Sequence, residues 1–294
     1  MKLLAFKLSI YFLMFSIIYY FSVNKHIMFR HTDHVKEIIK INNENLSYKR
    51  IKYEIDQKKK PFFINKIDKI NILVMGDSHS IDILNSLKQY EIDRPKNYEI
   101  KYHFLNEACL IKLMNNEIMS KNLDINEDKV CTQQISLFLK SKNFEKSDII
   151  IYSVYWTKFL PDYILKFNDY IKTKNKKIIF MGPNASFTKR PHEIIFKSVS
   201  IKQSNSFAFY NLDKNVLLIE SKLKKFLKNH KIPFLSKLIH VCPETSNTCE
   251  LVLNDRRLSY MDTNHWTMEG AIFFGKKIFS EDLDKLLKNL TMTE

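Results

Sequence analysis

The chain has 294 residues, and its 45% apolar and 27% charged content is typical of a folded globular protein rather than a disordered one. It contains only 4 glycines and 7 prolines, which excludes collagen-like and glycine-rich linker classes, and neither G-x-G-x-x-G nor G-x-x-x-x-G-K occurs. The excess of 47 Lys and Arg over 32 Asp and Glu gives a net charge of +15, but the lysines are scattered among Asn and Ile, so we expect no nucleic-acid partner.

An uncharged apolar run, residues 8–24, follows Lys2 and Lys7 near the N-terminus. A membrane-spanning helix needs about 17–25 such residues. A cleaved signal peptide would have a shorter apolar core and a small-x-small cleavage site, and no such site follows. We therefore expect residues 1–25 to form an uncleaved, single-pass anchor, with a signal peptide as the alternative. Basic residues flank both ends, and the simplest orientation keeps Lys2 and Lys7 inside.

The next segment, residues 26–67, is polar and charged, with KRIKYEIDQKKKP at its centre. We interpret it as a partly helical stalk that holds the following unit away from the membrane. Pro61 marks the change in composition, and residues 68–294 then alternate between strand and helix patterns. That length suits a single domain with a sizeable core, so we expect one domain behind a tether.

Continuous apolar runs after the stalk predict buried strands at residues 71–75, 98–105, 148–154 and 176–181. Apolar residues at helical spacing predict helices at 79–90, 131–142, 212–229 and 267–287. Strands that are separated by helical segments indicate a parallel sheet with helices on both faces. The sequence therefore predicts an α/β, doubly wound domain.

Four cysteines lie downstream of the expected anchor in two local pairs, Cys109 with Cys131 and Cys242 with Cys249. An even number of cysteines outside the cytoplasm favours disulfides, and pairing within each local pair would close short loops. Buried free thiols are the alternative. We expect no metal site, because the spacing is not C-x-x-C and no histidine cluster accompanies the cysteines.

The tetrapeptide Gly76-Asp77-Ser78-His79 comes directly after the first predicted strand. Ligands of doubly wound sheets bind beyond the carboxyl ends of the strands, and a serine at this turn lies near helix N-terminal amides that stabilise an oxyanion. Ser78 is therefore a candidate nucleophile. The alternative is a helix cap, since Asp and Ser are common caps.

A second polar segment, Asp262-Thr263-Asn264-His265, comes just before the last predicted helix. A serine nucleophile needs a base, and the base needs an orienting partner. Asp262 and His265, three positions apart, can hydrogen-bond while the histidine faces Ser78. A capped loop is the alternative, but the order Ser, Asp, His across an α/β domain favours a catalytic triad.

These two segments, the second continuing as Trp266-Thr267-Met268-Glu269-Gly270-Ala271, resemble the first and last blocks of the SGNH/GDSL hydrolase superfamily. The resemblance is strongest to the SGNH domain attached to acyltransferase-3 membrane proteins that O-acetylate bacterial surface polysaccharides. That domain typically shows G-D-S-H, two cysteine pairs, a strand ending near Trp, and D-x-x-H-L-S-x-x-G-A. The resemblance covers residues 68–290 and implies a flavodoxin-like, doubly wound SGNH fold.

Carried over to this chain, the resemblance implies that Ser78 is the nucleophile, His265 the base and Asp262 its partner. The Gly and Asn that complete the family's oxyanion hole are missing from their usual places, since no Gly lies between Asp77 and Met181. The family's G-x-N motif is absent after the third predicted strand, but Gly182-Pro183-Asn184 follows the fourth. This makes Asn184 a candidate oxyanion donor. His79 matches the fourth residue of the first block and is a candidate oxyanion or substrate contact, and we expect packing or support of the catalytic groups rather than acid-base catalysis. Trp156 would line a sugar site or belong to the core.

The resemblance implies a membrane-tethered serine O-acyltransferase that moves an acyl group, most simply acetyl, from an acyl donor to a surface glycan through an acyl-enzyme. A carbohydrate O-acetyl esterase is one alternative, and a degenerate glycan-binding or scaffold domain is another. No cofactor is implied. Because the multi-span acyltransferase module is absent from this chain, a transferase requires a separate membrane partner to supply acyl groups. The expected location is the inner membrane, with the catalytic domain in the periplasm.

Overall fold

The structure is a computed structural model that describes residues 32–42, 50–52, 55, 62–63, 69–93, 98–115, 125–279 and 286. The predicted anchor, residues 1–25, lies outside this part of the chain, as does more than half of the predicted stalk. Of the helices that the structure describes, none combines the length and the apolar content that crossing a membrane requires.

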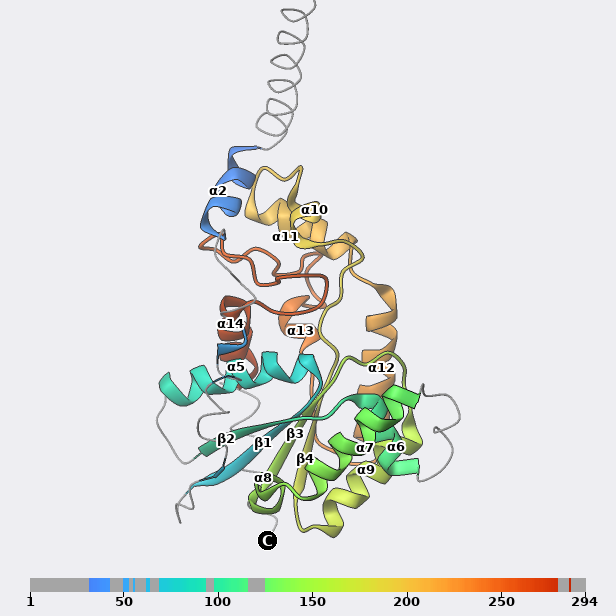
Figure 1. Cartoon of the computed structure of the whole chain (residues 1–294). Helices are drawn as coiled ribbons and strands as arrows, with labels where there is room; N and C mark the ends of the chain where they lie inside the picture. The colour runs from blue at the N-terminus through green and yellow to red at the C-terminus, as the bar shows by residue number, and fades with distance from the viewer. Residues whose placement is uncertain are drawn as a thin grey trace, which may run out of the picture.

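Five parallel strands form one sheet in the order β2-β1-β3-β4-β5 (Figure 1). The strands are β1 (Ile70–Gly76), β2 (Tyr98–Phe104), β3 (Ile149–Ser153), β4 (Lys177–Met181) and β5 (Phe234–Leu235). The first four confirm the predicted strands. The fifth has two residues, too few for an apolar run to be recognised in the sequence.

Both faces of the sheet are buried, which explains why its strands read as unbroken apolar runs. Successive side chains of a strand point to opposite faces. Ile72 and Val74 of β1 accordingly pack into one core, while Leu73 and Met75 pack into the other. The predicted doubly wound α/β domain is therefore confirmed.

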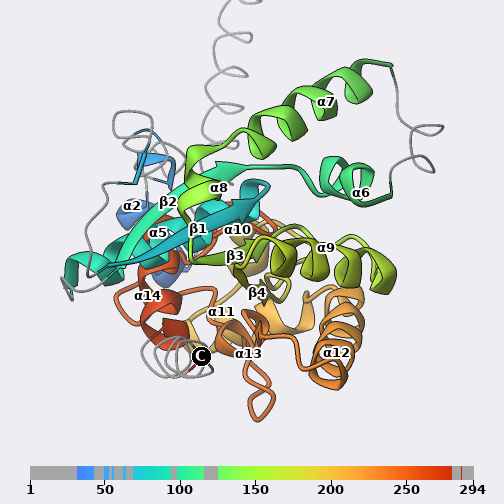
Figure 2. The same ribbon diagram turned by 90° about the horizontal axis from the view of Figure 1, so that it is seen from below.

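Helices cover each face, and α7 and α14 lie on opposite sides of the sheet in Figure 2. The first face carries α5 (Ser78–Asp93) and α14 (Met268–Ile278), which pack on each other. The second face carries α6 (Glu107–Asn115), α7 (Ile125–Leu139) and α9 (Pro161–Thr173). The other helices are α2 (Asp33–Ile41), α8 (Lys142–Lys146), α10 (Pro191–Ile195), α11 (Ile201–Tyr210), α12 (Lys214–Asn229) and α13 (Leu238–Val241).

The four predicted helices correspond to α5, α7, α12 and α14, with differences at their ends. Helix α7 ends at Leu139, because Ser141 then caps the short helix α8 by accepting a hydrogen bond from the Phe144 backbone N–H. Helix α14 begins after Thr267, whose hydroxyl accepts from the Gly270 backbone N–H, and ends at Ile278. Residues 280–285 and 287 of the predicted final helix lie outside the described residues.

Described residues of the expected stalk, 26–67, pack onto the domain. Helix α2 lies beside α10 and α11 (Figure 1) and buries Val35 and Ile38. His34 Nε2 lies 3.2 Å from the Ser204 hydroxyl of α11. Arg50 is also buried and reaches helix α5. These residues are part of the folded unit, since the domain supplies apolar surface that covers α2.

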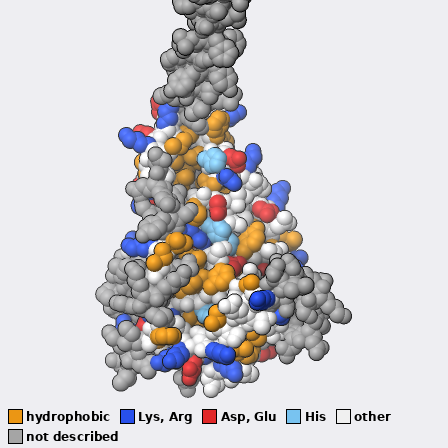
Figure 3. All heavy atoms as spheres, viewed as in Figure 1, with side chains coloured by type: hydrophobic (Ala, Val, Ile, Leu, Met, Phe, Trp, Pro, Cys, Tyr) orange, Lys and Arg blue, Asp and Glu red, His pale blue; other side chains and the backbone are white. Residues whose placement is uncertain are grey.

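The two local cysteine pairs both form disulfides, Cys109 with Cys131 and Cys242 with Cys249, so the alternative of free thiols is wrong. The first joins α6 to α7, and the second closes a short loop after α13. On the face shown in Figure 3, Lys and Arg side chains are scattered between hydrophobic and acidic groups. This distribution resembles the scatter of lysines along the sequence.

Candidate active site

The nucleophile candidate lies at the turn between β1 and α5. Gly76 ends the strand with φ of +145°, and a Cβ atom at this position would lie 1.8 Å from the Ser153 carbonyl oxygen of β3. Only glycine fits both this backbone conformation and this close approach. Ser78 then opens α5, where the positive end of the helix dipole faces the reacting group.

Ser78, His265 and Asp262 form a continuous hydrogen-bonded triad. The Ser78 Oγ and His265 Nε2 atoms are 2.9 Å apart, and His265 Nδ1 lies 2.8 Å from Asp262 Oδ2. A carboxylate at Nδ1 holds the ring proton there and leaves Nε2 to accept the serine proton. All three side chains are half-buried, so the site is open to a substrate. The geometry is that of an activated serine.

The loop that carries Asp262 and His265 is held by its own hydrogen bonds. The second carboxylate oxygen, Oδ1, accepts from the backbone N–H groups of Asn264 and His265. Burial alone would raise the pKa of Asp262, but the hydrogen bonds from the His265 ring and from these amides outweigh it and hold the pKa at about 2. Asp262 is therefore ionised throughout the neutral range, as the partner of a catalytic histidine must be.

The buried Asn184 side chain lies between helix α5 and the loop that carries Asp262 and His265. Its amide donates to Asp82 Oδ2 at 2.8 Å and to the Asn264 carbonyl at 2.9 Å. Both amide hydrogens are thereby used, so this arrangement leaves no donor for an oxyanion. The predicted oxyanion role is not supported by this geometry. Asn184 instead connects the 262–265 loop to helix α5, which carries Ser78.

The ring of His79 is buried beside the catalytic histidine. Its centroid lies 4.7 Å from that of His265 and 5.0 Å from that of Tyr155, on which it stacks. Burial, reinforced by the nearby charges of Lys237, His265 and Arg50, lowers the pKa of His79 well below its usual value. The ring is therefore neutral near pH 7, and it packs against the His265 ring.

Trp156 belongs mainly to the core. Its indole N–H donates to the Met181 carbonyl at 2.9 Å, and its ring meets Tyr152 edge-on at 5.9 Å. The side chain is almost completely buried, although it also forms part of the wall of a hollow beside the site. The neighbouring Tyr155 is the exposed aromatic residue of this segment.

Arg50 and Lys237 are two buried cations that the sequence reading missed. Arg50 pairs with Asp82 at 3.0 Å and donates to the Ser78 carbonyl at 2.5 Å. Lys237 donates to the Ser153 hydroxyl at 2.9 Å. Burial lowers the pKa of Lys237 to about 8, opposed by the negative charges of Asp82, Asp77 and Glu220. Arg50 lies within a charge-rich run, and no local pattern distinguishes it from its neighbours.

Two carboxyl groups with raised pKa values lie at the nucleophile turn: Asp77, which is part of the turn, and the buried Glu107. Asp77 accepts from the backbone N–H groups of His79 and Tyr155, each at 2.8 Å, and burial raises its pKa despite these bonds. Burial and the charge of Asp77 raise the pKa of Glu107 to about 7. Glu107 was also missed. It begins α6.

The site contains the groups needed for acyl transfer: a nucleophile, a base with the correct tautomer, and the N-terminus of a helix that favours negative charge. Within the described residues, no cluster of three or more His, Cys, Asp or Glu is arranged to hold a metal ion. The chemistry that this geometry supports is nucleophilic attack by Ser78 on a carbonyl carbon.

Comparison with known proteins places this site in a family. The model of the family described as "SGNH domain (fused to AT3 domains)" matches residues 49–279. The matched range includes Arg50 and every triad residue. None of the curated proteins matches the chain.

Several solved structures are similar to this chain at low sequence identity, and one of them has a TM-score above 0.5. The periplasmic domain of a lipopolysaccharide acetyltransferase from Salmonella ser. Paratyphi A has a TM-score of 0.54 and 18% identity, with 74% of this chain and 85% of that chain covered. An acylhydrolase from Bacteroides fragilis has a TM-score of 0.43 and 12% identity, with 81% and 98% covered. An acetyl xylan esterase has a TM-score of 0.40 and 14% identity, with 72% and 100% covered.

Proposed function

Because this chain belongs to the family of SGNH domains that are fused to AT3 domains, we propose that it is a serine O-acyltransferase acting on a cell-surface polysaccharide. The observation that carries the proposal is the triad, in which Ser78 Oγ lies 2.9 Å from His265 Nε2 and His265 Nδ1 lies 2.8 Å from Asp262. The family supplies the reaction class, and the acetyltransferase named among the similar structures makes acetyl the simplest acyl group.

In the first half of the reaction, Ser78 Oγ attacks the carbonyl carbon of the acyl donor while His265 Nε2 takes the serine proton. The tetrahedral oxyanion forms near the N-terminus of α5, whose dipole favours the negative charge. The intermediate then breaks the bond to the leaving group, which receives the proton from His265. The product is an acyl ester on Ser78.

In the second half, a sugar hydroxyl approaches the acyl-enzyme and gives its proton to His265 as its oxygen attacks the ester carbon. Collapse of this intermediate breaks the bond to Ser78 Oγ, which recovers the proton from His265. Water in place of the sugar would make the protein an esterase with the same residues. The half-buried triad admits either acceptor, so the acceptor has to be measured.

The proposal extends to location and partners. A membrane anchor at residues 1–25 would hold the domain in the periplasm, where both disulfides are stable. The acyl donor would come from a separate multi-span membrane acyltransferase, of the kind to which domains of this family are fused.

The first test treats the oxidised full chain with a fluorophosphonate, which phosphonylates activated serines, and measures intact mass. We expect one adduct on the wild type and none on Ser78→Ala or His265→Ala, since both variants lack an activated nucleophile. An adduct that persists in Ser78→Ala would place the reactive serine elsewhere. A folded, disulfide-bonded wild type that forms no adduct would contradict the enzyme proposal and favour the glycan-binding scaffold.

A further inference from the structure

A hollow of about 510 Å³ lies at the carboxyl ends of β3 and β4, the sheet edge that also carries the triad. Three segments line it: the loop after β3, the loop after β4, and the first two turns of α12. This is the sheet edge at which parallel α/β domains bind their ligands. The side chains that the argument uses are Tyr155, Lys158, Ser186, Asp213, Asn215 and Lys222.

Tyr155 connects this hollow to the catalytic histidine. Its ring stacks on His79 at 5.0 Å with an interplanar angle of 24°, and the His79 ring lies 4.7 Å from that of His265. The Tyr155 backbone N–H is fixed by Asp77. The side chain is 39% exposed and also lines the hollow. Because His79 stacks on one face of Tyr155, a sugar ring on the face toward the hollow would be separated from His265 by the Tyr155 and His79 rings.

The polar groups of the hollow suit a sugar. The Ser186 side chain is only 5% exposed, and its hydroxyl has no hydrogen-bond partner among the described residues. Asp213 and Asn215 add a carboxylate and an amide at the start of α12. Sugar rings combine an apolar face, which stacks on aromatic rings, with hydroxyl groups that need such partners.

The charge of the hollow favours an acidic sugar. Lys158 comes from the loop after β3 and Lys222 from α12, and both side chains are exposed at the hollow. They outnumber the single carboxylate of Asp213 in the lining. A carboxylate or phosphate on the ligand would complement this excess of positive charge.

We propose that this hollow binds one sugar ring of an acidic glycan acceptor, with the ring stacked on Tyr155 and the acidic group facing Lys158 and Lys222. The proposal rests on the proposed function, because it identifies the glycan that would receive the acyl group. Since the Tyr155 and His79 rings lie between this position and His265, the hydroxyl that gives its proton to His265 in the second half of the reaction would belong to a different sugar residue of the same glycan.

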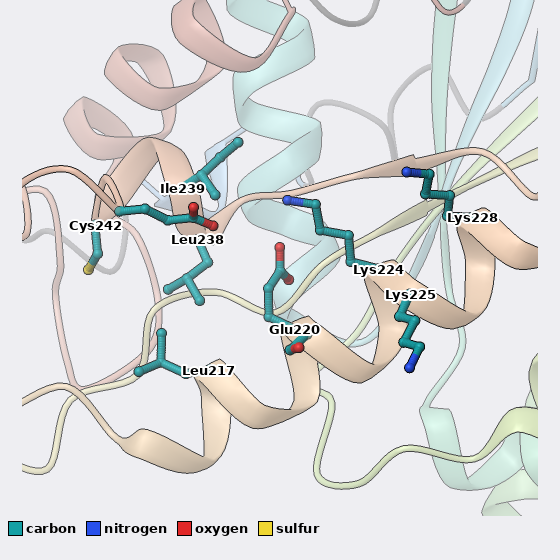
Figure 4. Close-up of a pocket in the computed structure, with 10 residues that line it drawn as sticks. Leu217, Glu220, Lys224, Lys225, Lys228, Leu238, Ile239 and Cys242 are labelled. Atoms are coloured by element: carbon teal, nitrogen blue, oxygen red, sulfur yellow. The ribbon is translucent and has the colours of Figure 1, made fainter.

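A second hollow, of about 410 Å³, provides an internal control (Figure 4). It lies between α12 and α13 and is lined by Leu217, Glu220, Lys225 and other residues that do not line the first hollow. Glu220 projects into it, and burial raises the pKa of its carboxyl to about 7. Lys225 is one turn from Lys222 on the same helix, and both side chains are exposed. Lys222→Glu and Lys225→Glu therefore change the net charge equally but alter different hollows.

The test measures binding of trigalacturonate, a simple acidic oligosaccharide, to the full chain by calorimetric titration, with neutral maltotriose in parallel. We expect trigalacturonate to bind, Tyr155→Ala to weaken binding about tenfold and Lys222→Glu about fivefold, because stacking and charge pairing are lost. Tyr155→Phe keeps the ring and should retain binding, and Lys225→Glu should bind as the wild type does.

Three results would overturn the proposal: no binding of trigalacturonate, equal binding of maltotriose, or an equal loss in Lys222→Glu and Lys225→Glu. Fluorophosphonate labelling of the same samples separates this proposal from the proposed function. Labelling of Ser78 without trigalacturonate binding would reject the sugar site alone. Binding that depends on Lys222, without any labelling of Ser78, would reject the acyltransferase and leave the sugar site.

Discussion

Ser78 and His265 are 187 positions apart in the sequence, yet their reacting atoms are 2.9 Å apart. Asp82 and Asn184, which are outside the triad, hold the two segments in this arrangement. Asp82, on the second turn of α5, accepts hydrogen bonds from Arg50 and from Asn184, and Asn184 also holds the Asn264 carbonyl. The geometry of the nucleophile and base therefore depends on a buried carboxylate that takes no part in the chemistry.

Glu107 gives the domain a measurable pH dependence. Its folded pKa of about 7 lies above the ordinary value of 4.5, so between these values the folded state holds a proton that the unfolded state has lost. The free energy of unfolding consequently falls as pH rises through this window, and the stabilisation is fully present only below pH 4.5. In Glu107→Gln, we expect the fall in unfolding free energy with pH to be smaller than in the wild type, by up to about 1.4 kcal/mol per pH unit.

Urea unfolding of wild type and Glu107→Gln at several values between pH 4.5 and 7 measures this slope. Glu220→Gln is the matched variant, because burial also raises the pKa of Glu220 to about 7. Glu220→Gln should also reduce the fall in unfolding free energy with pH, and the effects of the two substitutions should add if the sites are independent. A Glu107→Gln variant with the wild-type slope would show that this carboxyl is ionised in the folded protein at neutral pH.

At the scale of elements, the sheet brings the functional turns together because all of its strands are parallel. The carboxyl ends of β1, β3 and β4 meet at one edge, so the nucleophile turn, the Tyr155 loop and the Asn184 loop become neighbours. The loop that carries Asp262 and His265 reaches the same edge because α14 packs against α5. The position of His265 relative to Ser78 is therefore set by helix packing rather than by strand pairing.

The two disulfides should stabilise the domain to different extents. Cys109 and Cys131 are separated by 22 positions, and Cys242 and Cys249 by 7. In the loop-entropy treatment a longer closed loop restricts the unfolded chain more, which gives about 3.4 kcal/mol for the first and about 2.5 kcal/mol for the second. We expect the double variant Cys109→Ala/Cys131→Ala to lower the free energy of unfolding by roughly 1 kcal/mol more than Cys242→Ala/Cys249→Ala.

Urea denaturation of both double variants under identical oxidising conditions tests this order. The comparison is matched, since all four cysteines are buried and each variant removes two sulfur atoms. A larger loss in Cys242→Ala/Cys249→Ala would contradict the prediction. It would mean that the native contacts of the short loop outweigh the restriction of the unfolded chain.

At the scale of the whole molecule, the described segments that precede β1 are part of the domain. Helix α2 packs its buried face on α10 and α11, and Asn42 exchanges hydrogen bonds with the backbone of Arg256 and Leu258. Arg50 then reaches the start of α5. The described residues 32–42 and 50–52 are thus packed onto the domain, and we expect the position of the nucleophile to depend partly on the contact from Arg50.

Arg50 provides a direct test of this dependence. Arg50→Met leaves the Asp82 carboxylate buried without its ion-pair partner, which should cost about 3 kcal/mol of unfolding free energy. It also removes the donor to the Ser78 carbonyl, so fluorophosphonate labelling of Ser78 should slow. We expect Arg50→Lys to restore part of the labelling rate, because it keeps the charge but not the paired geometry.

Lys36→Met is the control for Arg50→Met, since Lys36 forms an exposed pair with Asp33 on α2. Pairs of this kind contribute less than about 1 kcal/mol, so both stability and labelling should stay close to the wild type. A labelling rate in Arg50→Met that equals the wild-type rate, at a temperature where both are folded, would show that Arg50 stabilises the fold without positioning Ser78.

The sequence by itself determined the strands β1 to β4, the disulfide pairing and the residues of the triad. Each is encoded locally: an apolar run buried on both faces, a short cysteine spacing, or a polar turn that directly follows a strand or precedes a helix. The tertiary structure alone decided the roles of Arg50, Lys237 and Asn184, and the placement of α2. The physical reason is that a buried charge or amide is defined by the partners that satisfy it, and here those partners come from segments far apart in the chain.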